Sequence, residues 1–238
     1  MASQTVQRIN VGNRLLATLS SEELDRLLPH AEIIRLPKSK VLYYPGDQVW
    51  YAYFPNKGMI SLLSVTESGA TIEVGMVGDE GMVGLPPILG VSTTPYESMI
   101  QIPVEALKIR VDVLRNEFNR GRRLHKTLLC YTHLLITQLS QSAVCNRFHS
   151  VEKRLCRWLL VASDCVNANT LNLTQEIISH MLGTPRTGVT MAAGELQKAG
   201  LISYSRGMIV ILDRQRLEAA SCECYHVNKE AFECFLDE

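Results

Sequence analysis

The stretch from Leu173 to Leu201 constrains the fold of this chain more than any other, because it is punctuated like two short helices joined by a tight turn. Thr174 can cap the first helix, since its hydroxyl group accepts a free backbone N–H. The apolar residues that follow at helical spacing are Ile177, Ile178, Met181 and Leu182. Gly183 then stands where a helix needs a left-handed exit, which glycine adopts without a steric cost.

A second helix is predicted directly after this turn. Thr184 is placed to cap it, and Pro185 suits its first turn, where a missing N–H does no harm. The predicted buried side of this helix consists of Val189, Ala192, Ala193 and Leu196. Residues 202–212 then alternate between apolar and polar about Arg206-Gly207, which predicts a β-hairpin.

Two helices, a glycine turn and a trailing hairpin form the layout of a winged helix-turn-helix, whose second helix enters the major groove of DNA. The sequence therefore predicts double-stranded DNA as a partner. The residues expected to contact it are Thr174, Gln175, Thr184, Pro185, Arg186, Thr187, Thr190 and Arg206. Residues 150–216 contain eight basic and five acidic residues, a local net charge of +3, although the whole chain is neutral.

This block resembles the C-terminal domain of the Crp/Fnr family of bacterial transcription regulators, whose members end in a sequence similar to LTQEDLAxxLGxSRxTVxRxLxxLxxxGLI. The matching positions are Thr174, Gln175, Leu182, Gly183, Arg186, Val189, Leu196, Gly200, Leu201 and Ile202. Pro185, Thr187 and Met191 stand where the family often has serine, glutamate and arginine. The resemblance thus implies a DNA-binding regulator without implying the family's usual operator sequence.

The N-terminal half has a different pattern. Between residues 33 and 111, short alternating runs are separated by turns such as Pro45-Gly46-Asp47 and Pro55-Asn56-Lys57-Gly58, which predicts an antiparallel sandwich or roll. A short helix before it is expected to be capped by Ser20 or Ser21. A helix followed by a β-roll resembles the cyclic-nucleotide-binding domain, which is the sensor of the same family.

The ligand signature of that sensor is poor in this chain. The family reads as glycine-glutamate and then an arginine that holds the cyclic phosphate through two bonds. Here glutamate precedes glycine at Glu80-Gly81, and Tyr96-Glu97-Ser98 lies near the position expected for the arginine. Residues 58–107 contain neither arginine nor lysine. The roll is therefore predicted not to bind cyclic AMP.

A long helix is predicted between the two halves. Asp112 is expected to cap a short helical segment before it, and residues 122–146 then contain neither proline nor glycine. The apolar seam expected at a dimer interface consists of Leu124, Leu128, Tyr131 and Leu135. Packing on its own roll is the other interpretation of this helix, and one helix can do both. The resemblance implies a homodimer, with residues 148–150 as the hinge.

The expected architecture is α+β, with three parts. They are an N-terminal antiparallel, cyclic-nucleotide-binding-like β-roll sensor at residues 1–118, a dimerisation helix and hinge at 119–148, and a winged helix-turn-helix with a C-terminal tail at 149–238. The function expected is sequence-specific binding to a palindromic operator through a recognition helix near residues 184–197, under allosteric control from the roll. The alternative is a cyclic-nucleotide-type module that acts on a protein partner without DNA; it would need the phosphate arginine and not the recognition helix.

Other features narrow the functional classes. The sequence holds no apolar run that could span a membrane and no G-x-S-x-G, P-loop or H-E-x-x-H motif, so a cytoplasmic, non-enzymatic protein is expected. A small-molecule effector and RNA polymerase are further candidate partners.

No cofactor or metal is predicted. The seven cysteines all follow residue 129, so the family's N-terminal iron–sulfur cluster is absent, and His125 and His133 are weak candidates for haem. Cys222 and Cys224, with Cys234 and His226 nearby, could hold a soft metal or form a redox pair. A reduced amphipathic helix with buried cysteines is the favoured interpretation, because zinc pairs usually take a C-x₂₋₄-C spacing.

Overall fold

The computed structural model describes residues 11–237, for residues 234, 236 and 237 only as backbone. The first ten residues of the predicted sensor therefore lie outside the described part. The chain begins there with α1 (Arg14–Ala17), α2 (Ser21–Leu27) and the short 3-10 helix η1 (Leu28–His30). Ser20 caps α2 through a capping box with Glu23, which confirms one of the two predicted caps.

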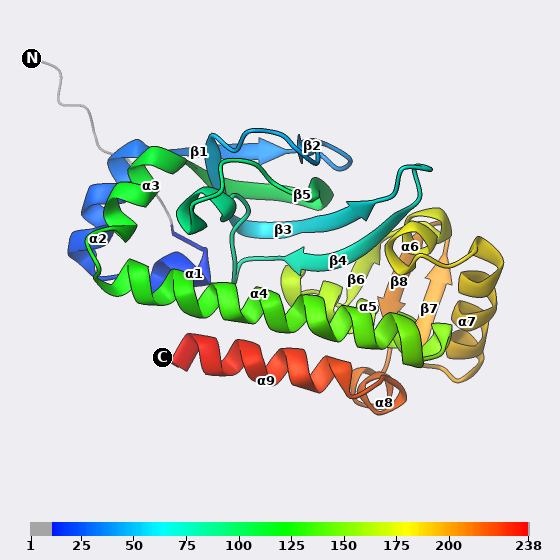
Figure 1. The fold of residues 1–238 in the computed structure, drawn as a ribbon. Coiled ribbons are helices and arrows are strands. Elements are labelled where there is room, and N and C mark those ends of the chain that lie inside the picture. Colours follow the sequence, from blue (N-terminus) through cyan, green and yellow to red (C-terminus); the bar gives the residue numbers. More distant parts are fainter. Residues whose placement is uncertain (1–10, 238) are drawn as a thin grey trace, which may run out of the picture.

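The predicted antiparallel β-roll is present. Its strands are β1 (Ala31–Leu36), β2 (Val41–Tyr43), β3 (Tyr51–Val65), β4 (Thr71–Val77) and β5 (Glu97–Arg110), with the 3-10 helix η2 (Pro86–Leu89) between the last two. The sheet order is β1-β5-β3-β4, and β2 also pairs with β5. Figure 1 shows these strands as one curved layer above the long helix.

One predicted turn is wrong. The segment from Pro55 to Gly58 does not end a strand but forms bulges inside β3, where the pairing with β5 shifts register. Gly58 has a φ of +91°, and a Cβ atom there would lie 2.1 Å from the carbonyl oxygen of Pro103. Glycine is needed because the two strands approach closely at the bulge, so two expected short strands merge into one of 15 residues.

Two helices lead out of the roll: α3 (Val111–Phe118) and α4 (Arg123–Phe148). The predicted cap at Asp112 is wrong, because the N-cap is Arg110 and Asp112 lies inside the first turn, where it pairs with the Arg110 guanidinium at 2.9 Å. The predicted long helix is confirmed at 26 residues. It runs along the roll and reaches the C-terminal half (Figure 1).

The C-terminal half begins with α5 (Val151–Val166), capped by Ser150. The elements after it are β6 (Thr170–Asn172), α6 (Gln175–Leu182), α7 (Arg186–Lys198), β7 (Ile202–Ser205), β8 (Met208–Ile211) and α8 (Arg214–Ala220). β6 pairs with β8 and extends the predicted hairpin to three strands. The last helix, α9 (Cys224–Asp237), leaves this domain and runs back along α4 in the opposite direction (Figure 1).

Two large buried clusters among the described residues connect the roll, the long helix and the winged domain. The first joins the roll to α4 and to Phe235 of α9. The second is the core of the winged domain, and it also includes Met59, Leu63 and Met76 of the roll. The winged domain is therefore packed against β3 and β4 by buried apolar side chains. None of the helices described in the structure is long and apolar enough to cross a membrane.

The dimer seam predicted on α4 needs correction. Leu124, Leu128 and Tyr131 are at most 2% exposed and belong to the roll's own core, with Leu135 packed against it. Tyr131 fixes this face of the helix, because its hydroxyl donates to the Met82 carbonyl at 2.8 Å. The spacing predicted an apolar seam correctly, but the seam packs on the roll and not on a second copy of the chain. Apolar residues recur every 3.6 positions in either case, so the sequence pattern does not distinguish the two.

Candidate nucleic-acid interface

The helix-turn-helix geometry follows from local signals in the sequence. The Thr174 hydroxyl accepts the Ile177 N–H at 3.3 Å and caps α6, as predicted. Gly183 ends the helix in the left-handed conformation with a φ of +55°. A Cβ at this glycine would lie 2.8 Å from Ile72 of β4, so the turn also packs closely against the roll.

The start of α7 differs from the prediction in one detail. The N-cap residue is Pro185, with no side-chain cap, and α7 begins at Arg186. Thr184 is half-buried, and its hydroxyl lies 3.3 Å from both the Arg154 guanidinium and the Leu182 carbonyl oxygen. Arg154 also donates to that carbonyl. Thr184 therefore connects the turn to α5 instead of capping the recognition helix.

The exposed face of α7 carries the side chains that could reach a groove. Arg186, Thr187 and Thr190 are exposed, as is Met191, which retains 73% of its accessible surface. The opposite face, Val189, Ala192, Ala193 and Leu196, is buried against the rest of the domain as predicted. A helix of this kind presents its polar N-terminal half outward while the small residues allow α6 to pack closely.

A hollow of about 340 Å³ joins the two helices to the hairpin. Its lining residues are Thr174, Gln175, Arg186, Gln197, Tyr204, Arg206 and Gly207. It unites four of the eight residues predicted to contact DNA. Thr187 and Thr190 lie beside it on α7, and Thr190 Oγ1 lies 2.9 Å from Gln175 Oε1. Gln197, near the end of α7, and Tyr204, on β7, were not predicted, because only the tertiary fold brings them to the same hollow as the start of α6.

The hollow is polar and basic. It holds two arginines and no carboxylate among its lining residues, which suits a phosphate backbone. Arg206 and Gly207 have φ values of +50° and +78°, the backbone of the tight hairpin turn that was predicted. Tyr204 is held in place by donating to the Leu173 carbonyl at 3.1 Å, and burial raises the pKa of its hydroxyl.

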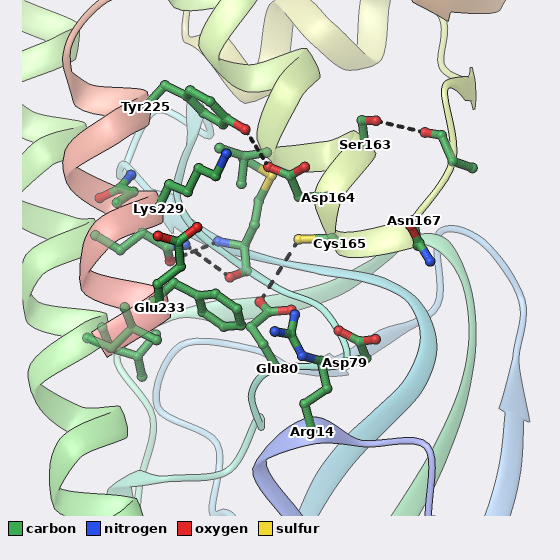
Figure 2. A pocket seen from close by; sticks show the side chains of 18 of the residues that line it. Arg14, Asp79, Glu80, Ser163, Asp164, Cys165, Asn167, Tyr225, Lys229 and Glu233 are labelled. Atoms are coloured by element: carbon green, nitrogen blue, oxygen red, sulfur yellow. Dashed lines mark hydrogen bonds between the residues drawn. The ribbon is translucent and has the colours of Figure 1, made fainter. Parts of the chain in front are cut away.

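A larger cavity of about 750 Å³ lies at the junction of the roll, α4, α5 and α9 (Figure 2). Charged groups of both signs line it, among them Arg14, Asp79, Glu80, Asp164, Lys229 and Glu233. Burial raises the pKa of Glu80 to about 7, although the Gly78 N–H donates to its carboxylate at 2.9 Å. Asn228, also in the lining, has a buried amide with no hydrogen-bond partner among the described residues. Such an arrangement can bind a polar small molecule.

Comparison with known proteins adds a second line of support. Residues 33–120 match the model of the cyclic nucleotide-binding domain, and residues 153–220 match the Crp-like helix-turn-helix domain. The global nitrogen regulator of Nostoc sp. strain PCC 7120 is 25% identical over 185 residues, which are 73% of this chain and 82% of that protein.

Solved structures share the fold. FixK2 from Bradyrhizobium japonicum has a TM-score of 0.70 at 15% identity and covers 81% of this chain and 98% of its own. The c-di-GMP responsive regulator CLP of Xanthomonas campestris has a TM-score of 0.68 at 18% identity, with coverages of 82% and 100%. The order of roll, long helix and winged domain, together with both domain matches, shows that this chain belongs to the Crp/Fnr family of DNA-binding transcription regulators.

Proposed function

We propose that the chain acts as a cytoplasmic homodimer that binds a palindromic operator and presents it to RNA polymerase. The observation that carries the DNA interface is the basic hollow beside the exposed face of α7. Arg186 would read a guanine through O6 and N7, with Thr187 and Thr190 beside it. Arg206 would bind a phosphate from the hairpin tip, and Thr174 and Gln175 would bind the backbone at the start of α6.

Met191 gives the interface a preference for thymine at one position of the half-site. The side chain is long, apolar and exposed on the same helical face as Thr187. An apolar group in the major groove is best placed against the C5-methyl of thymine. We assign Met191 to a thymine in each half-site, and we assign Thr184 the role of positioning α7 through Arg154, since its hydroxyl is occupied there.

The dimer interface we propose is the outer face of α4. Its exposed residues at helical spacing are Leu129, His133, Ile136, Ser140 and Val144. Leu129 and Ile136 are 47% and 55% exposed, which is costly for side chains of this size on one stripe. A second copy of α4 would cover them and place two recognition helices about 34 Å apart, the spacing of successive major grooves.

The functional units are then the sensor at residues 1–118, the dimerisation helix at 119–148 and the DNA-binding domain at 149–238. The cavity of Figure 2 lies where all three meet, because α9 returns from the third unit to the first two. We propose that it binds a polar effector with groups of both charges. Occupancy would change how α5 and α9 sit against α4 and thereby the separation of the recognition helices.

The test of the DNA interface is selection of a randomised duplex library with the purified full chain. The expected result is a palindrome with half-sites about one helical turn apart. Enrichment of no sequence would contradict the proposal and favour a sensor module that acts on a protein partner.

The effector site has a separate test. Native mass spectrometry after incubation with zwitterionic metabolites is expected to show a one-to-one adduct. Asn228→Phe, which fills the cavity, should abolish the adduct, whereas His226→Ala on the exposed side of α9 should retain it. An adduct that survives Asn228→Phe would place the effector elsewhere.

A further inference from the structure

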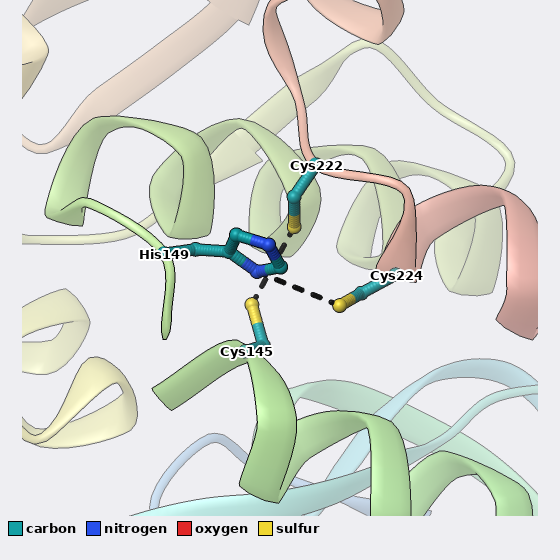
Figure 3. Close-up of side chains that lie close together, drawn as sticks. All are labelled: Cys145, His149, Cys222 and Cys224. Atoms are coloured by element: carbon teal, nitrogen blue, oxygen red, sulfur yellow. Dashed lines mark hydrogen bonds between the residues drawn. The ribbon is translucent and has the colours of Figure 1, made fainter. Parts of the chain in front are cut away.

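Four side chains with metal-binding atoms converge at the end of the long helix (Figure 3). Cys145 lies in the last turn of α4, and His149 directly follows that helix. Cys222 stands just before α9, and Cys224 is its first residue. Their three sulfur atoms and one ring nitrogen all lie within 4.8 Å of one another. The three cysteines are buried, and the histidine is half-buried.

Two of the six donor–donor distances match one tetrahedral ion, and the others lie within 4.8 Å. Zinc binds cysteine sulfur at about 2.3 Å and histidine nitrogen at about 2.0–2.1 Å, so a tetrahedron separates two sulfurs by about 3.8 Å and a sulfur from a nitrogen by about 3.6 Å. The Cys145 and Cys222 sulfurs are 3.5 Å apart, and the Cys224 sulfur is 3.6 Å from His149 Nδ1. A disulfide would need about 2.05 Å.

The surroundings complete the arrangement. His149 Nε2 lies 3.2 Å from the Glu223 carboxylate, which leaves Nδ1 facing the sulfurs. A carboxylate behind a metal-binding histidine fixes its ring and tautomer in many zinc sites. Arg154 and Arg157 are buried and interact electrostatically with Cys145, so they would offset the net negative charge of three thiolates around a divalent ion. Within the part of the chain that the structure describes, the Nε of each arginine has no hydrogen-bond partner.

We propose that Cys145, His149, Cys222 and Cys224 bind a structural Zn²⁺ ion in tetrahedral Cys₃His coordination. Three sulfur donors and an imidazole select zinc over the hard cations Mg²⁺ and Ca²⁺. All four positions are filled by protein, which is typical of a structural rather than a catalytic zinc. Loading converts the three thiols to thiolates and releases their protons to solvent.

The ion would connect the hinge to the C-terminal helix. Cys145 and His149 flank the junction between α4 and α5, and the two other ligands lie at the entry to α9, whose Phe235 is buried in the roll core. The zinc therefore fixes α9 against α4 and limits how far the winged domain can turn about residues 148–150. Cys145 and Cys222 are 77 positions apart, so the sequence alone could not pair them.

The partners differ from those expected from the sequence. His226 is exposed and its ring packs edge-on against Tyr225, and the side chain of Cys234 lies outside the described residues. The C-x-C spacing of Cys222 and Cys224 disfavours zinc if the other two ligands must also come from the C-terminal helix. In the fold they are Cys145 and His149, at the end of α4.

The experiment is metal analysis of the full chain purified under reducing conditions, followed by replacement with Co²⁺. We expect one zinc per chain by plasma mass spectrometry, and a cobalt form with the intense visible absorption of a tetrahedral, thiolate-rich site. Cys145→Ser and Cys222→Ser should lose the zinc, whereas Cys130→Ser on the same helix and Cys156→Ser on α5 should retain it.

Misfolding of the serine variants is controlled by His149→Cys, which keeps four donors and should keep the zinc. Far-UV circular dichroism of each variant accompanies the metal analysis. Wild-type protein without zinc that also takes up no Co²⁺ when reduced would overturn the proposal, as would a Cys145–Cys222 disulfide found in protein purified without reductant from zinc-supplemented cells. The readout is metal content, so it is independent of whether the chain binds an operator.

Discussion

Trp158 of α5 donates its indole N–H to the carboxylate of Glu73 on β4 at 2.6 Å, across the boundary between the winged domain and the roll. Ser61 of β3 donates to the other oxygen of the same carboxylate at 2.5 Å. All three side chains are buried. A polar contact of this kind fixes how the two domains meet, because a buried carboxylate that lost either donor would remain partly unsatisfied.

Glu73 makes stability depend on pH. Burial raises its pKa from the ordinary 4.5 to about 7, because the effect of burial exceeds that of the two hydrogen bonds, which lower the pKa. Burial likewise raises the pKa of Glu80 to about 7. The folded chain therefore binds more protons than the unfolded chain between these values. The free energy of unfolding should fall as the pH rises from about 5 to 7, with each group contributing at most about 1.4 kcal/mol per pH unit.

Urea unfolding of the wild type and Glu73→Gln at several pH values checks this prediction. The glutamine can accept from Trp158 and donate to Ser61, so the variant should fold and show a smaller dependence on pH. Glu67→Gln, on the exposed turn between β3 and β4, is the matched control and should leave the dependence unchanged. Identical pH profiles for wild type and Glu73→Gln would show that Glu73 does not titrate in this range.

Arg186 is expected to specify one base pair. Arg186→Ala should weaken binding to the selected operator by about 1–3 kcal/mol and relax selectivity at a single position in each half-site. Fluorescence anisotropy with the operator and its single-base variants measures both effects. Arg35→Ala, at an exposed arginine of β1, controls for a general loss of positive charge. Equal operator affinity of Arg186→Ala and wild type would remove Arg186 from the interface.

Arg206 is expected to act through charge alone. Arg206→Ala should weaken binding to all sequences to a similar extent, because a phosphate contact carries no base information. The slope of log K against log salt should become shallower by about one unit. Titrations at several salt concentrations test this, and an unchanged slope would place the hairpin tip away from the DNA.

Substitutions on the two faces of α4 are expected to distinguish dimerisation from folding. Leu129→Glu with Ile136→Glu should give a folded monomer by light scattering that binds the operator poorly, since both side chains are exposed in one chain. Leu128→Ala should instead cost about 2–5 kcal/mol of stability, because Leu128 is 1% exposed in the roll core. A dimer that persists in the double variant would place the interface on another surface.

The features predicted correctly from sequence are those set by neighbouring residues. The caps at Ser20 and Thr174 and the left-handed exit at Gly183 depend on a few positions each. The features that were predicted wrongly depend on tertiary contacts. The segment from Pro55 to Gly58 became a bulge because β5 pairs with β3 on both sides of it, from Tyr51 to Leu63.

Long-range pairings left no signal in the sequence. The apolar seam of α4 could not be assigned to the roll or to a second copy, because the helical repeat is the same for both. Thr184 looked like a cap until Arg154, 30 positions away, was seen to occupy its hydroxyl. The cluster around Cys145 depends on α9 folding back along α4, which composition and spacing do not indicate.

Cyclic nucleotides are expected to find no cationic partner in the segment of the roll that carries the family's ligand signature. Residues 58–107 carry no lysine or arginine, and a phosphate that loses its water without a cationic partner is unfavourable. The arginines at the start of the long helix, which are the nearest candidates for a phosphate contact, interact with other groups. Arg122 pairs with Glu22 at 3.5 Å, and Arg123 donates to the Thr18 carbonyl at 3.3 Å, both on the side of α1 and α2.

Isothermal calorimetry with cyclic AMP and cyclic GMP is therefore expected to show no binding, and neither nucleotide should change the affinity for the operator. The family's ligand signature resembles the segment at Glu80-Gly81, and the carboxylates of Asp79 and Glu80 would repel a phosphate placed there. A one-per-chain isotherm with a micromolar dissociation constant would contradict this. It would mean that Arg122 or Arg123 leaves its present partner, and Arg122→Ala with Arg123→Ala would then abolish the binding.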